Sequence, residues 1–138
     1  MSALANLRQG SKDILELMDV LQVLIRTDHV RHTGTVQNLF LKLGDMVNDH
    51  FALEEGSLFR GLLRHEDESV QATARRFLDG KRELKKFFKH YLHRWCEQGM
   101  REEECEDFIV ETDRLFAMLR RWVHDVESRL HPLVQEAA

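Results

Sequence analysis

A long apolar stripe at the period of an α-helix constrains this sequence more than any other feature. Between Val36 and Leu63 the apolar residues recur every three or four positions, the spacing that places them on one face of a helix. The members of this stripe are Val36, Leu39, Phe40, Leu43, Met46, Val47, Leu58 and Leu62. The stripe predicts one long amphipathic helix, ending at about Arg64, whose apolar face is buried against other elements.

Three other stretches repeat the pattern and predict three further helices. They run from about Ser11 to Arg26, from about Ser69 to Trp95, and from Glu102 to about Val134, and Asp79-Gly80-Lys81 interrupts the middle one. The 138 residues contain one Pro and seven Gly, which leaves little turn chemistry for a many-stranded fold. We therefore expect an all-α protein: one domain, residues 1–138, forming an antiparallel up-down-up-down four-helix bundle.

Charge and hydropathy exclude several classes of partner. The net charge is −4 and there is no basic block, whereas non-specific nucleic-acid binding requires a positive face. The sequence has no apolar run of about 18 residues that would span a membrane, and its N-terminus lacks the apolar core of a signal peptide. We expect a cytoplasmic protein that binds neither nucleic acid nor membrane. Its expected partner is another protein, and the sequence leaves open whether that partner is a second copy in a homodimer.

Two cysteines, Cys96 and Cys105, bracket the expected turn between the third and fourth helices. The favoured interpretation is a pair of reduced cytosolic thiols. The alternative is a redox pair that closes the two helices, which requires Cα atoms near enough for a disulfide.

The stripe of the second helix contains two polar residues, His50 and Glu54. They are four positions apart, so the imidazole and the carboxylate lie one above the other on the face expected to be buried. Burying an uncompensated carboxylate is costly. Glu54 therefore needs a metal ion, a cation or a hydrogen-bond donor beside it.

The residues around this pair form a recognisable motif. The segment from His50 to Phe59 fits the pattern His-Phe-x-x-Glu-Glu-x-x-Leu-Phe, which resembles the second-helix motif of the hemerythrin-like (HHE cation-binding) family. The ending Leu130-His131-Pro132-Leu133 is similar to the Leu-Phe/Tyr-Pro-Leu ending of that family. The resemblance implies a four-helix bundle with a di-iron site in its core, whose His and carboxylate ligands come from all four helices.

Most of the ligand positions implied by the resemblance carry other residues here. Gly-Ser replaces the Glu-His of the first helix, Lys stands at the ligand position of the third, and Trp and Val stand at the His and Glu positions of the fourth. These residues are Gly10, Ser11, Lys81, Trp122 and Val126. Trp and Val side chains do not ligate iron. The family pattern is therefore present with a degenerate metal site, and we expect no cofactor.

Lys81 offers a replacement for the missing metal charge. Its position on the inward side of the third helix lets its long side chain reach Glu54 on the second helix. His50, one turn from Glu54, is placed to donate a further hydrogen bond. We therefore expect a buried polar cluster of His50, Glu54 and Lys81 that holds a metal-free bundle together.

Two alternatives involve the other histidines. In the first, His50 and Glu54 bind iron in a mononuclear site together with His90, His93 or a water; the competing interpretation places His90 and His93 on a solvated helix face. In the second, His124 is a ligand, but it misses the inward register of the fourth helix by two residues. Turning His124 inward would turn the apolar stripe outward.

These observations favour a non-enzymatic regulatory or protein-binding module. The sequence has no Gly-rich phosphate loop, no Cys-x-x-Cys and no Ser-His-Asp order, so nothing indicates an enzyme. The alternative function is an iron-binding sensor or carrier of oxygen, nitric oxide or iron, built on His50 and Glu54 with further histidines.

Overall fold

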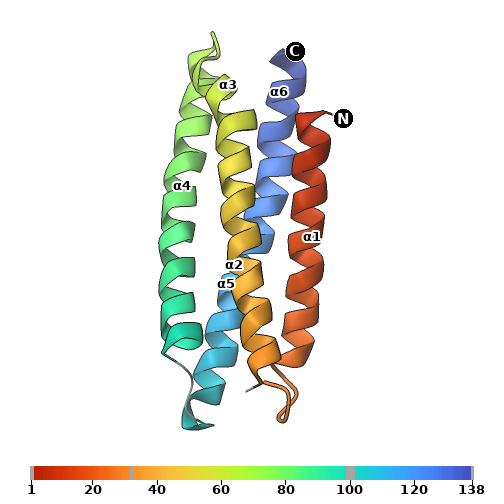
Figure 1. Cartoon of the computed structure of the whole chain (residues 1–138). Coiled ribbons are helices and arrows are strands. Elements are labelled where there is room, and N and C mark those ends of the chain that lie inside the picture. Colours follow the sequence, from red (N-terminus) through yellow and green to blue (C-terminus); the bar gives the residue numbers. More distant parts are fainter. Residues whose placement is uncertain (1, 32, 99–101, 138) are drawn as a thin grey trace.

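Four long helical rods make up the protein. A computed structural model of the chain describes residues 2–31, 33–98 and 102–137, and every regular element within these ranges is helical. The rods are α1 (Ala3–Leu24), α2 (Gly34–Glu54), α4 (Glu68–Leu92) and α5 (Cys105–Asp125) (Figure 1). The short helices α3 (Arg60–Leu63) and α6 (His131–Ala137) extend α2 and α5. The expected all-α four-helix bundle is confirmed.

Short segments of other helix types complete the rods. The π-helical segments are η1 (Glu55–Phe59), between α2 and α3; η2 (His93–Glu97), after α4; and η4 (Val126–Leu130), between α5 and α6. The 3₁₀ turn η3 (Glu102–Glu104) precedes α5. Pro132, the second residue of α6, has no N–H to donate, and its ring clashes with the preceding turn of a regular α-helix. The wider turn of η4 lets the helix continue past this proline.

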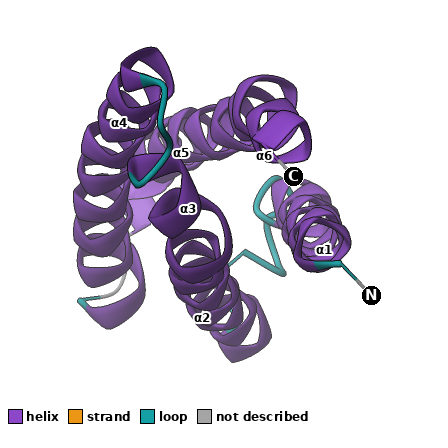
Figure 2. Cartoon of the chain, turned by 90° about the horizontal axis from the view of Figure 1, so that it is seen from above, coloured by secondary structure: helices purple, strands orange, loops and turns teal. Residues whose placement is uncertain are grey.

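The rods pack around one core. Figure 1 shows both chain ends and the 64–67 connection at one end of the rods, with the α1–α2 connection at the other. Seen end-on in Figure 2, the rods surround a common interior. Contacts join α1 to α2 and to α5, and α4 to α2 and to α5. The side chains that fill this interior are mainly Leu7, Met18, Leu21, Phe40, Leu43, Leu58, Leu62, Leu84, Phe88, Leu115, Phe116, Leu119 and Leu130. Among the described residues, no helix is long and apolar enough to span a bilayer.

Two sequence predictions about helix limits are wrong. The first helix begins at Ala3 rather than Ser11, because buried Leu7 extends its apolar stripe and the Ser2 side chain caps it by accepting a hydrogen bond from Ala5 N at 3.1 Å. The third helix runs through Gly80 without interruption. A Cβ added at Gly80 would meet only the Trp122 ring at 3.9 Å, which is ordinary contact. Close packing therefore does not require this glycine.

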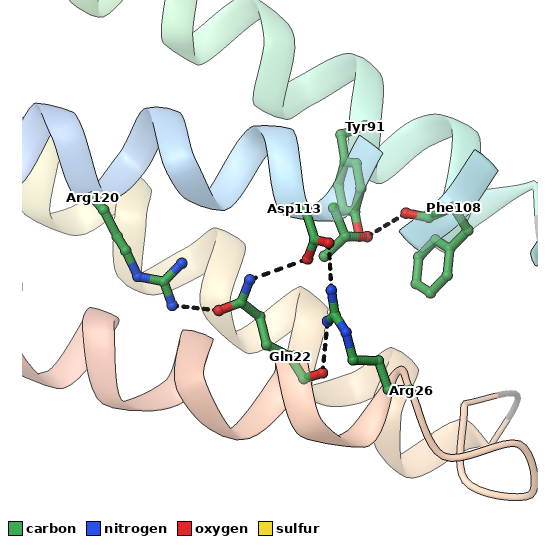
Figure 3. Close-up of polar contacts among 7 residues, drawn as sticks. Gln22, Arg26, Tyr91, Phe108, Asp113 and Arg120 are labelled. Atoms are coloured by element: carbon green, nitrogen blue, oxygen red, sulfur yellow. Dashed lines mark hydrogen bonds and ion pairs between the residues drawn. The ribbon is translucent and has the colours of Figure 1, made fainter. Parts of the chain in front are cut away.

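A polar network ties the end of α1 to α5 (Figure 3). Gln22 Nε2 donates to Asp113 Oδ1 at 3.1 Å, and Gln22 Oε1 accepts from Arg120 Nη2 at 2.5 Å. Arg26 forms an ion pair with the other oxygen of Asp113. The two side chains are 47% and 40% exposed, so solvent screens the pair and it adds little stability.

A buried hydroxyl relay lies beside this network and gives a stability prediction. Thr112 Oγ1 donates to Phe108 O at 2.7 Å, so the Tyr91 hydroxyl, 2.5 Å from Thr112 Oγ1, must donate to it. Thr112→Val leaves the Tyr91 hydroxyl buried without a partner and is expected to cost about 1–3 kcal/mol. Tyr91→Phe leaves the Thr112 bond intact and is expected to cost about 0.5–1.5 kcal/mol. Urea denaturation measures which variant loses more unfolding free energy, and a larger loss for Tyr91→Phe than for Thr112→Val would contradict the assigned donor.

Candidate functional site

A cluster of polar side chains lies inside the apolar core at the level where α2 passes into η1. Each of the four rods, counted with its extension, contributes at least one member. The members are Ser11 from α1, His50 and Glu54 from α2, Lys81 from α4, Trp122 from α5 and His131 from α6, and all are buried. The sequence predicted three of them as a cluster: His50, Glu54 and Lys81.

Glu54 is the centre of the cluster. Its side chain is only 2% exposed, and Lys81 Nζ lies 3.2 Å from its Oε1 atom. Trp122 Nε1 donates to both carboxylate oxygens at 3.3 Å, and His50 Nε2 lies 3.5 Å from Oε2. Glu54 thus has a cation and an indole N–H beside it, which offset the cost of its burial.

Lys81 is as deeply buried as its partner. Its Nζ atom donates to the carbonyl oxygen of Phe51 at 2.7 Å and lies 3.8 Å from Glu55 Oε1. The ammonium also lies 5.0 Å and 4.9 Å from the ring centroids of Phe51 and Phe59, within cation–π range. Burial lowers the pKa of Lys81 below its usual 10.5, and the Glu54 carboxylate works in the opposite direction. The contact that the sequence predicted between Lys81 and Glu54 is present.

The close approach of α1 to α2 shapes the other side of the cluster. His50 Nε2 is hydrogen-bonded to Ser11 Oγ at 3.2 Å. A Cβ added at Gly10 would lie 2.8 Å from His50 Nδ1, closer than real Cβ atoms approach. Gly10 provides the space that the His50 ring occupies, and Ser11 provides the hydroxyl to which it is hydrogen-bonded.

Sequence reasoning missed the roles of Trp122 and His131. It placed Trp122 inward but not as a donor to Glu54. His131 is 2% exposed, and its Nδ1 atom has no hydrogen-bond partner among the described residues. A signal for it existed, since His131 stands where the resembling motif has Phe or Tyr. Burial lowers the pKa of His131, Arg8 and His50 lower it further, and Glu54 opposes them.

The other candidate histidines lie outside the cluster. His90 and His93 are exposed on one face of the α4 rod, where His93 Nδ1 lies 2.7 Å from Glu97 Oε2. His124 is exposed on α5, whereas Trp122 and Val126 are buried. The alternative register that makes His124 a core ligand is therefore wrong.

The two cysteines do not close the third and fourth helices. Neither Cys96 nor Cys105 forms a disulfide. Burial raises the pKa of the Cys96 thiol to about 11, which keeps it protonated and unreactive at neutral pH. Cys105 Sγ lies 2.9 Å from Arg31 Nη1, which donates to it. Both thiols are therefore reduced in this structure, as the favoured interpretation of the sequence expects.

The donor set of the cluster does not fit a metal ion. Within residues 2–31, 33–98 and 102–137, no three His, Cys, Asp or Glu side chains are arranged to hold one. A divalent cation on Glu54 would also lie beside the like charge of Lys81.

Comparisons of the chain with protein-family models, with curated proteins and with solved structures give no match. The contacts themselves indicate a cluster that fixes the four helices relative to one another.

The lowered pKa of His131 gives a prediction about acid stability. The unfolded chain binds a proton at this residue more readily than the folded protein, so stability is complete above the usual pKa of 6.5 and falls as pH drops below it. His131→Phe removes this loss. We expect the wild type to lose more unfolding free energy than His131→Phe between about pH 8 and about pH 5. Urea denaturation at both pH values measures the difference, with exposed His124→Phe as the matched control. Equal losses in all three proteins would refute the assignment.

Proposed function

We propose that this chain is a hemerythrin-like, up-down-up-down bundle in which an ion pair has replaced the di-iron site, acting as a non-enzymatic regulatory or protein-binding module. The observation that carries the proposal is the 3.2 Å contact between Lys81 Nζ and Glu54 Oε1 in the core. In the family that the sequence resembles, iron would supply the positive charge beside this carboxylate. Here a covalently attached ammonium supplies it, and no metal is needed to offset the buried charge.

The surroundings of the pair support a structural role for the cluster. Glu54, Lys81 and Trp122 join three different rods through polar contacts that are shielded from water. Charges held this way are paired and buried, whereas a catalytic group has to meet its substrate. The module would therefore act through its surface, on a protein partner in the cytoplasm. For the alternative, an iron-dependent sensor or carrier, the described part of the chain offers no group of three His, Cys, Asp or Glu side chains that could hold the metal ion.

Metal analysis of the purified protein tests the proposal. We expect protein expressed with added iron to contain iron well below one atom per chain. We also expect its melting temperature to be unchanged by Fe²⁺ and by a chelator, because a ligand that binds the folded state raises that temperature. Two irons per chain, or a melting temperature that falls on chelation, would overturn the proposal and support the iron-binding alternative.

A further inference from the structure

A pocket of about 520 Å³ opens between the η1–α3 segment and α4. Its volume is in the range of small-molecule sites, which is about 300–1,000 Å³. Phe59, Leu63 and Leu78 give it an apolar lining, and buried Lys81 reaches it from the polar cluster. The pocket is therefore a concave, partly apolar surface, and the charge of Lys81 at its inner end is already paired with Glu54.

The lining of this pocket carries an excess of cations. Arg60, Arg64, Arg82 and Lys85 line it together with one acid, Glu55. Arg82 lies 3.5 Å from Asp79, but no ion pair among the described residues includes Arg60, Arg64 or Lys85. The chain as a whole has a net charge of −4, so this concentration of unpaired cations runs against its overall charge.

The positions of these cations and of the apolar side chains favour a ligand with an anionic group at one end and an apolar body at the other. Arg60 and Arg64 are one turn apart at the end of the α2 rod, and Lys85 lies across the pocket on α4. Guanidinium groups bind carboxylate and phosphate through paired N–H donors, and a lysine adds a compact charge. An anionic group held between them would leave the rest of the ligand against Phe59, Leu63 and Leu78.

We propose that this pocket binds a small organic anion, in which a carboxylate or phosphate group is attached to a compact apolar body. The anionic group binds Arg60, Arg64 and Lys85, and the apolar body packs against Phe59 and the two leucines. Binding at this pocket does not depend on whether an ion pair has replaced a metal site in the core. The pocket lies outside the polar cluster and shares only Lys81 with it.

Isothermal titration calorimetry with simple probes tests the proposal. Octanoate and phenyl phosphate represent the two sources of the anionic group, 1-octanol represents the apolar body alone, and inorganic phosphate represents the charge alone. The test variant is Arg64→Gln with Lys85→Gln, two exposed residues of the pocket. The matched control is Arg75→Gln with Lys42→Gln, two exposed residues outside the pocket, which makes the same change in net charge.

We expect saturable binding of at least one of the two organic anions, and weaker binding of octanol and inorganic phosphate. The pocket variant should raise the dissociation constant about tenfold, equivalent to about 1.4 kcal/mol, and the control should leave it nearly unchanged. Added salt should weaken binding to the wild type, which tests the charge without any mutation. The tighter anion identifies the ligand class. No saturable binding of either anion, equal affinity for octanol, or equal effects of the two double variants would overturn the proposal.

Discussion

Lys81→Met is expected to destabilise the protein by about 3–5 kcal/mol, because it leaves the Glu54 carboxylate buried without its cation. Lys81 and Glu54 are each only 1% exposed, so water cannot replace the lost partner without opening the core. The substitution also removes the donor to Phe51 O and the charge over two aromatic rings. The free energy of unfolding of natural domains is only about 5–15 kcal/mol, so this loss would be a large part of the total stability.

The double variant Lys81→Met, Glu54→Leu separates the ion pair from a general packing defect. Replacing both charges with apolar groups of similar size is often neutral, so the double variant should recover much of the loss. Urea denaturation of the wild type, both single variants and the double variant gives the coupling energy. Lys86→Met, at an exposed position on the same helix, is the control and should change stability little. A coupling energy near zero would refute the pair.

The helical pattern predicted the fold well because it depends on burial alone. The apolar residues of α2 recur on one face, and that face is buried as expected. The beginning of α1 was harder to predict, and the helix begins at Ala3 rather than at the expected Ser11. In the structure Gly10 lies inside α1, and the His50 ring occupies the space where a side chain at this position would be. The packing of His50 against α1 is a contact between helices, and the local sequence of α1 does not contain it.

The contacts of the site differ in the same way: some follow from the burial of a charge, and others depend on how the helices pack. The Lys81–Glu54 contact was predictable, because a buried carboxylate needs a cation and Lys81 lies on the inward side of the third helix, within reach of Glu54. The hydrogen bonds from Trp122 to Glu54 and between Ser11 and His50 were not. They depend on side-chain rotamers and on the rotation of each helix about its axis, which packing between helices sets.

Trp122→Ala is expected to cost about 3–5 kcal/mol, because it removes a large buried side chain and leaves a cavity. The indole ring lies edge-on to Phe51 and Phe77, with centroid distances of 5.9 Å and 5.8 Å. Its N–H is the second donor to Glu54, so the truncation also weakens the compensation of that charge. Thermal and urea denaturation measure the loss.

Trp122→Phe separates these two contributions, since it keeps much of the apolar volume and removes only the indole N–H and part of the ring. We expect it to cost about 1–3 kcal/mol, the range for a buried polar group that loses its partner. His124→Ala, at an exposed position on the same helix, should change stability by less than about 0.5 kcal/mol. If Trp122→Ala barely moved the denaturation midpoint while His124→Ala lowered it, α5 would have the opposite face inward. The contact between Trp122 and Glu54 would then be absent, and His124 would return as a candidate ligand in the core.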